Sequence, residues 1–293
     1  MLAEMGSIQI ASIATVGSDQ QLIDLWLHGK SANTQQAYRR DIEYFLAFLE
    51  GKALQAVTLN DVQAFDAALK QQGYSEGTVK RRMNAVKSLM KYGHDLGALA
   101  VNAAKPFKVR KGADRLSERI LTESQIQRMI HSFKGSERDR LILKFLYATG
   151  CRVSELVSLT WQSCKTWDDG KGELTIHGKG DKTRTILLSA ELWGEVLQLR
   201  QGRSLKDAVF PSRKGNGLTR AQINRIVAKA ADQAGIDKAV SPHWLRHAHA
   251  SHSLKRGAAL NLVQKSLGHS RLDTTAVYLH ASPEDSSGLY LVL

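Results

Sequence analysis

Hydrophobic side chains recur at three- and four-residue intervals along much of the chain, which is the spacing of helices that bury one face. This pattern predicts helices over residues 33–49, 78–92, 141–148, 219–234 and 258–267. In the second of these segments, one face is formed by Val79, Met83, Val86 and Met90. Gly150 and Gly268 follow two of the predicted helices, at the position where glycine commonly ends a helix.

Residues that favour helix starts precede several of these segments. Asn33 and Thr122 can accept hydrogen bonds from the first turn of a following helix. Ser241 can do the same, and Pro242 after it suits the first helical position. Asp273 can cap a last helix that carries Tyr278.

Two short segments differ from this helical pattern. Residues 173–177 and 183–188 are rich in threonine and branched aliphatic residues, and they flank the turn sequence Gly178-Lys-Gly-Asp181. Such a pair predicts a β-hairpin. The chain is therefore expected to be mainly α-helical, with a small β-hairpin or sheet in its second half.

A basic segment separates two halves of the chain. Residues 105–115 contain Pro106 and Gly112, which interrupt the helical pattern, and carry five basic residues against one acidic residue. A chain of 293 residues is long enough for two domains. We therefore predict a loose leader over residues 1–18, a helical domain over 19–112 and a second domain over 113–293.

Charge points to a polyanion as the partner. The 41 basic and 28 acidic side chains give a net charge of +13 and an isoelectric point near 9.8. No acidic residue interrupts residues 78–94, where basic side chains off the hydrophobic face include Lys80, Arg81, Lys87 and Lys91. The helix over 219–234 leaves exposed Arg220, Gln222 and Arg225. Such a face is an ordinary solvated surface or a contact surface for DNA, and the overall charge favours DNA.

Cysteine and hydropathy patterns exclude other classes of protein. Cys151 and Cys164 have neither the number nor the spacing of a disulfide framework or a metal site. No Lys or Arg precedes Lys30, and no apolar run approaches the ~18 residues of a membrane span. We therefore expect a cytoplasmic protein, associated with the nucleoid if its partner is DNA.

The segment from Ser241 to His252 carries the main candidate chemistry. His243 and Arg246 are three residues apart and so share a helix face. His269 comes directly after Gly268, and Tyr278 follows. Imidazoles, a guanidinium and a phenol delivered from consecutive helix ends indicate a site for an anionic group that the phenol could attack.

A metal site is the alternative for this histidine-rich segment. His243 and His247 are four residues apart on a helix, which suits two metal ligands. However, His249 and His252 point to other faces, and no cysteine or carboxylate completes a set. No metal is expected.

These motifs together resemble those of the tyrosine recombinases, the phage integrase superfamily. Four stretches carry the resemblance in the second half of the chain, in the family's order: Ala148-Thr-Gly-Cys-Arg152-Val-Ser-Glu-Leu156, His177-Gly-Lys179-Gly-Asp-Lys-Thr-Arg184, His243-x-x-Arg246, and Leu267-Gly-His269 followed by Tyr278. Thr34-Gln-Gln-Ala-Tyr-Arg-Arg-Asp41 is similar to the family's N-terminal domain, and in length and layout the chain resembles the Xer subgroup.

The resemblance implies a fold and a reaction. The fold is an N-terminal helical core-binding domain of SAM-like type, followed by a catalytic domain. Tyr278 would be the nucleophile that forms a 3′-phosphotyrosyl bond with DNA, Arg152 and Arg246 would clamp the phosphate, and Lys179 would protonate the leaving oxygen. His243 would accept the tyrosine proton, and His269 would hydrogen-bond the phosphate. For His247 the family suggests a supporting role. The helix over 219–234 could read base edges.

The same resemblance implies the setting of the reaction. Paired DNA sites, a homo-tetramer or a hetero-tetramer with a related recombinase, and no cofactor are expected. A type IB topoisomerase shares the chemistry and a catalytically silent DNA-binding regulator shares the charge, but the N-terminal domain disfavours the first and the complete set of catalytic residues the second. The apolar residues 289–293 are expected either to fold back on their own domain or to dock on a neighbouring subunit.

Overall fold

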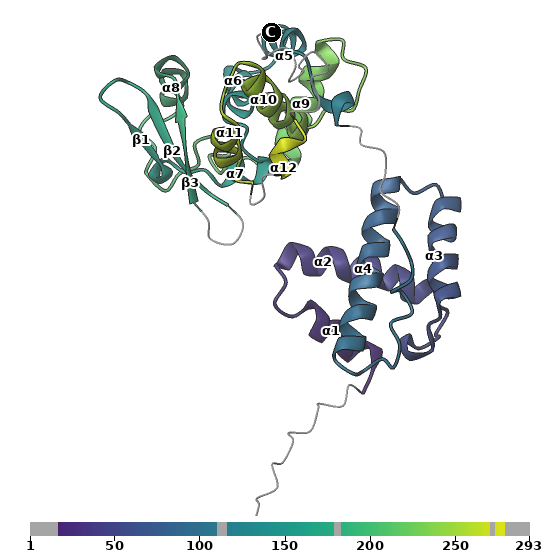
Figure 1. Ribbon diagram of the computed structural model, residues 1–293. Helices are drawn as coiled ribbons and strands as arrows, with labels where there is room; N and C mark the ends of the chain where they lie inside the picture. The colour runs from purple at the N-terminus through teal and green to yellow at the C-terminus, as the bar shows by residue number, and fades with distance from the viewer. Residues whose placement is uncertain (1–16, 110–115, 179–182, 270–272, 279–293) are drawn as a thin grey trace, which may run out of the picture. The chain divides into compact units, whose positions relative to one another are not determined.

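The structure is a computed structural model, and it describes residues 17–109, 116–178, 183–269 and 273–278 (Figure 1). The chain divides into two compact units, Met1–Ala113 and Asp114–Leu293. The predicted boundary near Gly112, the leader up to residue 16, the hairpin tip with Lys179 and the C-terminal residues 279–293 lie outside the described residues. Each unit has a hydrophobic core of its own.

The first unit is entirely helical in its described residues. Its elements are α1 (Asp19–Leu27), α2 (Ala32–Phe48), a 3₁₀ turn (Leu54–Ala56), α3 (Leu59–Gln71) and α4 (Glu76–Asp95). Helix α4 packs against α1, α2 and α3 (Figure 1). The predicted hydrophobic face of α4 is buried, with Met83 and Val86 wholly inaccessible. The central position of α4 explains why its hydrophobic pattern is so regular.

The start of α2 differs from the prediction. Ser31, not Asn33, occupies the N-cap position, and the helix includes Asn33 in its first turn. Both residue types favour caps, so the local sequence allows either start. Ser31 makes no side-chain cap bond, but the other three helices of this unit are capped: Ser18 accepts from the Gln21 amide at α1, Thr58 forms a capping box with Asp61 at α3, and Ser75 accepts from the Thr78 amide at α4.

The second unit packs a small sheet against one side of a group of helices (Figure 1). Its helices are α5 (Glu123–His131), α6 (Glu137–Thr149), α7 (Val153–Ser158), α8 (Ala190–Leu197), α9 (Arg220–Gln233), α10 (Pro242–Lys255), α11 (Leu260–Leu267) and α12 (Asp273–Ala276). Two 3₁₀ turns, Ser117–Arg119 and Trp161–Ser163, complete the described helical elements. Helix α6 packs against α10, α5, α8 and α9, which places its hydrophobic residues at the centre of the core.

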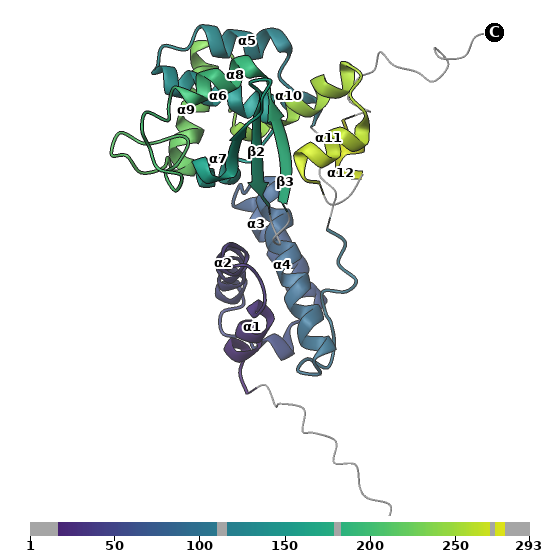
Figure 2. The same ribbon diagram turned by 90° about the vertical axis from the view of Figure 1, so that its left-hand side faces the viewer.

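The sheet has three antiparallel strands in the order β1 (Cys164–Thr166), β2 (Gly172–His177) and β3 (Thr183–Leu188). Leu174 of β2 lies opposite Cys164 on one side and Ile186 on the other. The predicted hairpin is confirmed, but β1 was not predicted because three residues carry too little pattern. Helix α11 lies against β3 (Figures 1 and 2).

Two glycines end helices inside the stretches that carry the family resemblance. Gly150 follows α6 with φ of 59°, and Gly268 follows α11 with φ of 65°. Both angles lie in the left-handed region that favours glycine. The last helix is shorter than expected: α12 ends at Ala276, and Tyr278 lies in the turn after it. In the described part of the chain, no helix is both long and apolar enough to span a membrane.

Candidate active site

Arg246 is the buried centre of the candidate site. It extends from α10 and is 1% exposed. Its Nη1 donates to the carbonyl of Gly150 at 2.6 Å, and its Nη2 donates to the carbonyl of Leu267 at 2.6 Å. Both acceptors are at helix C-terminal ends, where carbonyl groups lack intrahelical partners. Burial, and then the charge of Arg152, lower the pKa of Arg246 to about 10, so the guanidinium remains charged at neutral pH.

Arg152 reaches the same helix end from a different element. It is the N-cap residue of α7, and its side chain is 40% exposed. Its Nη1 lies 3.5 Å from the Leu267 carbonyl, and its Nη2 lies 3.4 Å from that of Gly268. Arg152 and Arg246 therefore converge on the turn that precedes His269.

Glu155 and Arg184 complete this cluster, and sequence reasoning gave neither of them a role. Glu155 is 5% exposed and accepts hydrogen bonds from the Arg152 amide and from Arg152 Nη1. Arg184 of β3 donates to both of its carboxylate oxygens, at 2.9 and 2.8 Å. Burial alone would raise the pKa of Glu155, but the hydrogen bonds from Arg184 and Arg152 lower it. The only sequence feature that pointed to a role was that Glu155 and Arg184 lie inside the stretches that resemble the family's motifs.

The phenol of Tyr278 is docked against α10. Its hydroxyl lies 2.7 Å from Nδ1 of His247, and the residue is 4% exposed. Burial, and then the neighbouring His243 and Arg246, lower the pKa of His247 to about 4, so its ring is neutral and can accept the phenol proton in a hydrogen bond. Burial also raises the pKa of Tyr278. The described arrangement is therefore a neutral phenol on a neutral imidazole.

His243 and His269 lie beside this pair. The ring centroids of His243 and His247 are 4.3 Å apart, and His243 is among the exposed residues. Nδ1 of His269 lies 2.8 Å from the hydroxyl of Thr275, a fully buried residue of α12. Burial, and then Arg246 and Arg152, lower the pKa of His269 to about 4. The histidine hydrogen-bonded to the Tyr278 hydroxyl is thus His247. The role of His243 as the proton acceptor, which the family resemblance implies, stays a prediction.

The remaining candidates are less closely tied to this cluster. In the described parts of the chain, no group of three or more His, Cys, Asp or Glu side chains is arranged to hold a metal ion. Burial raises the pKa of Cys151 to about 11 and that of Cys164 to about 12, which makes both thiols unreactive. Lys179 lies outside the described residues, so its hairpin contributes only the flanking strands here.

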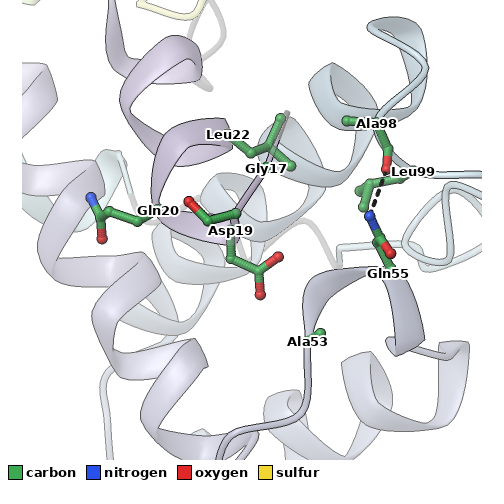
Figure 3. A pocket seen from close by; sticks show the side chains of 9 residues that line it. Gly17, Asp19, Gln20, Leu22, Ala53, Gln55, Ala98 and Leu99 are labelled. Carbon is green, nitrogen blue, oxygen red and sulfur yellow. Dashed lines mark hydrogen bonds between the residues drawn. The ribbon is translucent and has the colours of Figure 1, made fainter. Parts of the chain in front are cut away.

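A cavity in the first unit is a separate feature (Figure 3). It has a volume of about 440 Å³ and lies between the start of α1 and the residues around Ala53 and Leu99. Its one carboxylate, Asp19, accepts a hydrogen bond from the Leu54 amide, and the Gln55 amide nitrogen lies 3.4 Å from the Ala98 carbonyl. These polar groups serve the fold, and no cluster of reactive side chains accompanies them.

The predicted DNA-contact residues of α4 differ in whether their charged groups are already bonded within the protein. Lys80 is exposed, and Arg81 is exposed but forms an ion pair with the buried Asp41. Lys87 donates to the carbonyls of Ala104, at 3.0 Å, and Phe107, so its amine is turned toward its own chain. Lys91 pairs with Asp95 one helical turn later.

The predicted residues of α9 are also of two kinds. Arg220 and Arg225 are exposed. Gln222 is half-buried, and its side-chain oxygen accepts hydrogen bonds from the Thr219 amide and hydroxyl in a capping box. Gln222 therefore starts the helix, and its amide NH₂ group is what remains for a partner.

Comparison with known families accounts for nearly the whole described chain. Residues 119–285 match the phage integrase family, and residues 19–95 match the N-terminal SAM-like domain of phage integrases. The chain belongs to the phage integrase family. It is a site-specific tyrosine recombinase, an enzyme that breaks and rejoins DNA strands, as its sequence predicted.

Individual relatives agree with this assignment, and solved structures share the fold. The tyrosine recombinase XerD of Vibrio cholerae is 34% identical over 292 residues, which cover 92% of this recombinase and 93% of the relative. XerD of Listeria innocua is 32% identical over 283 residues, with coverage of 89% and 94%. In fold, the recombinase is similar to XerH bound to its difH substrate, with a TM-score of 0.69, 24% identity and coverage of 93% and 83%. A lambda integrase dimer on a core site gives a TM-score of 0.76 at 18% identity, with coverage of 92% and 96%.

Proposed function

We propose that this recombinase cuts DNA by attack of the Tyr278 hydroxyl on a phosphodiester. The oxygen–phosphorus bond of a 3′-phosphotyrosine forms as the bond from phosphorus to the 5′ oxygen breaks, and the 5′ oxygen leaves as a hydroxyl after gaining a proton. A 5′ hydroxyl from another strand reverses the step and restores the phosphodiester. The phosphotyrosine retains the energy of the broken bond, so the two steps balance without a nucleotide.

One observation carries this proposal. The Tyr278 hydroxyl is hydrogen-bonded to α10 through His247, and the same helix supplies Arg246, whose guanidinium meets that of Arg152 at the Leu267 carbonyl. A nucleophile and two phosphate-binding groups are thus gathered on one end of the second unit. Guanidinium groups suit the non-bridging oxygens of a phosphate because their N–H groups form a planar fork.

The remaining roles follow from chemistry and from the family's motifs. His243, exposed beside His247, is the group we assign to take the phenol proton once DNA is bound. His269 donates to a non-bridging oxygen through the nitrogen that Thr275 does not occupy. Lys179 protonates the leaving 5′ oxygen, a general-acid contribution of roughly 10²–10⁴ in rate.

Tyr278 must move before it can react. A phenol that is 4% exposed cannot reach a phosphate on the outside of a duplex. The turn from Thr275 to Tyr278 is closed by a hydrogen bond from the Tyr278 amide to the Thr275 carbonyl. We infer that DNA binding releases the hydroxyl from His247, and that the described arrangement is the resting state of the nucleophile.

DNA is the partner, and its contact surfaces are part of the proposal. We assign backbone contacts to exposed cations of α4, above all Lys80, and contacts along the groove to Arg220 and Arg225 of α9. Exchange between two sites requires four active sites, so we propose a tetramer on DNA, of this chain alone or with a related recombinase. The apolar segment 289–293, which lies outside the described residues, is proposed to dock on a neighbouring subunit. The reaction would take place at the nucleoid.

A capture experiment tests this function. Random-sequence duplexes with a nick are incubated with the recombinase, and DNA that stays attached in denaturant is sequenced to identify a cleavable duplex. The wild type should form this adduct, and Tyr278→Phe should bind the duplex but form none. Tyr147→Phe, which removes a hydroxyl bonded to His252 elsewhere in the same unit, is the matched control and should retain the adduct. An adduct that persists in Tyr278→Phe would exclude Tyr278 as the nucleophile.

Two further arms separate related activities. Recombination between two copies of the captured duplex, scored as joined products, distinguishes a recombinase from a topoisomerase that relaxes supercoils without paired sites.

The adduct should also form in the presence of a metal chelator. Loss of the adduct that is restored only by added metal would support the metal interpretation of the histidine-rich segment.

A further inference from the structure

Arg184 is a buried guanidinium in the catalytic unit that the proposed chemistry does not use. Its side chain is 7% exposed. Nε donates to the carbonyl of Ser266 at 2.6 Å, and Nη1 and Nη2 donate to the two carboxylate oxygens of Glu155 at 2.9 and 2.8 Å. Its hydrogen bonds are thus directed into the protein, and little of the side chain is left to face a ligand.

The acceptors of Arg184 connect it to both halves of the site. Ser266 begins a run of three residues, Ser266 to Gly268, whose carbonyls receive N–H groups from Arg184, Arg246 and Arg152. His269 follows this run directly. A side chain on Gly268 would place its Cβ 3.1 Å from Cδ and Nη1 of Arg184, so a residue without a side chain lets the guanidinium lie against the end of α11.

The other acceptor, Glu155, is shared with the phosphate clamp. Its buried carboxylate accepts from Arg184 and also from Nη1 of Arg152. One negative charge is therefore divided between two guanidinium groups. Without Arg184, the same buried carboxylate would have Arg152 as its charged partner, and Arg152 would be held more strongly to Glu155 than to a phosphate.

We propose that Arg184 is a positioning residue for strand cleavage: it compensates the charge of Glu155 so that Arg152 can bind the phosphate, and it fixes the Ser266–Gly268 turn that places His269. Arg184 also stands in β3, the strand that leaves the hairpin carrying Lys179. This inference rests on the proposed function of Tyr278 and Arg152.

The main variant is Arg184→Met, which keeps much of the side-chain length and removes the charge. On the captured duplex we expect an affinity within about threefold of the wild type and a rate of adduct formation at saturating DNA lowered by roughly 10–100-fold, as for outer-shell partners in other sites. Arg184→Lys keeps the positive charge but cannot form the paired hydrogen bonds. Its rate of adduct formation should therefore lie between those of the wild type and Arg184→Met.

A double variant separates charge compensation from simple loss of structure. Glu155→Gln in the Arg184→Met background removes the uncompensated carboxylate, so adduct formation should recover at least threefold over Arg184→Met. If Arg184 instead contacted the phosphate directly, the second substitution would bring no recovery. The double-mutant cycle therefore reports a coupling that a merely structural role for Arg184 would not produce.

Arg138 provides a matched control. It lies near the opposite end of α6 from Gly150, pairs with the carboxylate of Asp139 and donates to the carbonyl of Pro211 at 2.6 Å. Arg138→Met removes the same kinds of bond away from the site, and its adduct rate should stay within about threefold of the wild type. Equal losses in Arg138→Met and Arg184→Met would overturn the inference.

The outcomes can be separated from failure of the proposed function. If the wild type forms no adduct through Tyr278, the proposed function is wrong. If the wild type forms the adduct and Arg184→Met does so at the same rate, only the role of Arg184 is wrong. Should Arg184→Met fail to fold, the double variant and Arg184→Lys decide: no adduct formation by a folded Arg184→Lys, together with no activity of the folded double variant, would contradict charge compensation.

Discussion

Two buried guanidinium groups, Arg246 in the catalytic unit and Arg82 in the N-terminal unit, are held in opposite ways. Arg246 donates to the helix-end carbonyls of Gly150 and Leu267. Arg82 is 6% exposed and lies between the rings of Tyr44 and Tyr74, 3.8 and 4.1 Å from their centroids. Its Nε and Nη1 atoms have no hydrogen-bond partner among the described residues.

The charges around the two groups also differ. Asp41, 1% exposed, pairs with Arg81, and one of its oxygens lies 3.8 Å from Nε of Arg82. In the second unit, Glu155 bonds Arg152 and Arg184, while Arg246 bonds carbonyls alone. This cluster of described residues therefore has three guanidinium groups and one carboxylate, which leaves two positive charges uncompensated. Carbonyl groups orient a guanidinium without neutralising it. The cluster in the second unit therefore keeps an excess of positive charge, as the proposed phosphate contact requires, whereas the cations of the N-terminal cluster contact a carboxylate and aromatic rings of their own unit.

The largest effect is expected from a comparison of Arg246→Leu with Arg82→Leu. Arg246→Leu should lower the rate of adduct formation by about 10²–10³ or more, the usual loss when one donor to a developing oxyanion is removed. It should also lower the free energy of unfolding by about 1–3 kcal/mol because two buried carbonyls lose their donors. Arg82→Leu should leave the rate at saturating DNA within about twofold.

Adduct formation and denaturant unfolding, measured on the same preparations, check both expectations. Arg246→Lys serves as the variant that keeps the charge, in case Arg246→Leu does not fold. A loss of cleavage rate in Arg82→Leu equal to that in Arg246→Leu would show that the two clusters are not different in kind.

Sequence patterns predicted the helices better than the contacts between them. The faces of α4 and α9 follow from spacing alone, because each helix buries one stripe. The start of α2 could not be predicted from spacing, because Ser31 and Asn33 are both residues that favour N-caps. Which of them begins the helix depends on how the helix packs. Strand β1 has three residues and depends on its neighbour β2 for pairing.

The site shows the same limit. The spacing of His243 and Arg246 placed them on one helix face, and the motifs named the other residues. The bond from Tyr278 to His247 and the sharing of Glu155 by Arg184 join residues that are 31 and 29 positions apart in the chain. Contacts at such separations are set by tertiary packing, for which local periodicity carries no information.

Acid pH should distinguish the two units by their histidines. The pKa values of His247 and His269 are both about 4, lowered mainly by burial, whereas the ordinary value is 6.5. Between these values the unfolded chain binds more protons, so stability is full above pH ~6.5 and falls as pH decreases toward ~4. Partial exposure of His269 reduces its share, and together they should account for on the order of 1–3 kcal/mol.

The N-terminal unit contains a carboxyl group whose contribution to stability changes with pH in the opposite direction. Burial raises the pKa of Asp41, so the stability linked to that carboxyl is present at low pH and is lost as pH rises through its folded value. Hydrogen exchange on the full chain at pH 7 and 5, corrected for intrinsic rates, should therefore show protection lost in α10 and α11 but not in α4. His247→Gln/His269→Gln should reduce the loss. Equal loss in both units would contradict the comparison.

The smallest expected effect concerns two lysines of α4 that look equivalent in the sequence. Lys80 is exposed, while the Lys87 amine donates to the carbonyls of Ala104 and Phe107, at the end of the unit. Lys80→Gln should reduce the slope of log K against log salt by about 0.9, the value for one phosphate contact, with little change in stability.

Lys87→Gln should do the reverse, because its amine is already committed to the fold. We expect an unchanged salt slope and a loss of about 1 kcal/mol in the free energy of unfolding, since the two carbonyls lose a charged donor. Both variants are compared by DNA binding at several salt concentrations and by denaturant unfolding. A salt slope that falls in Lys87→Gln would mean that the amine leaves Ala104 and Phe107 when DNA binds. The basic row of α4 would then act as one surface, as its sequence alone suggests, and the distinction drawn between exposed and engaged cations would not extend to the DNA-bound state.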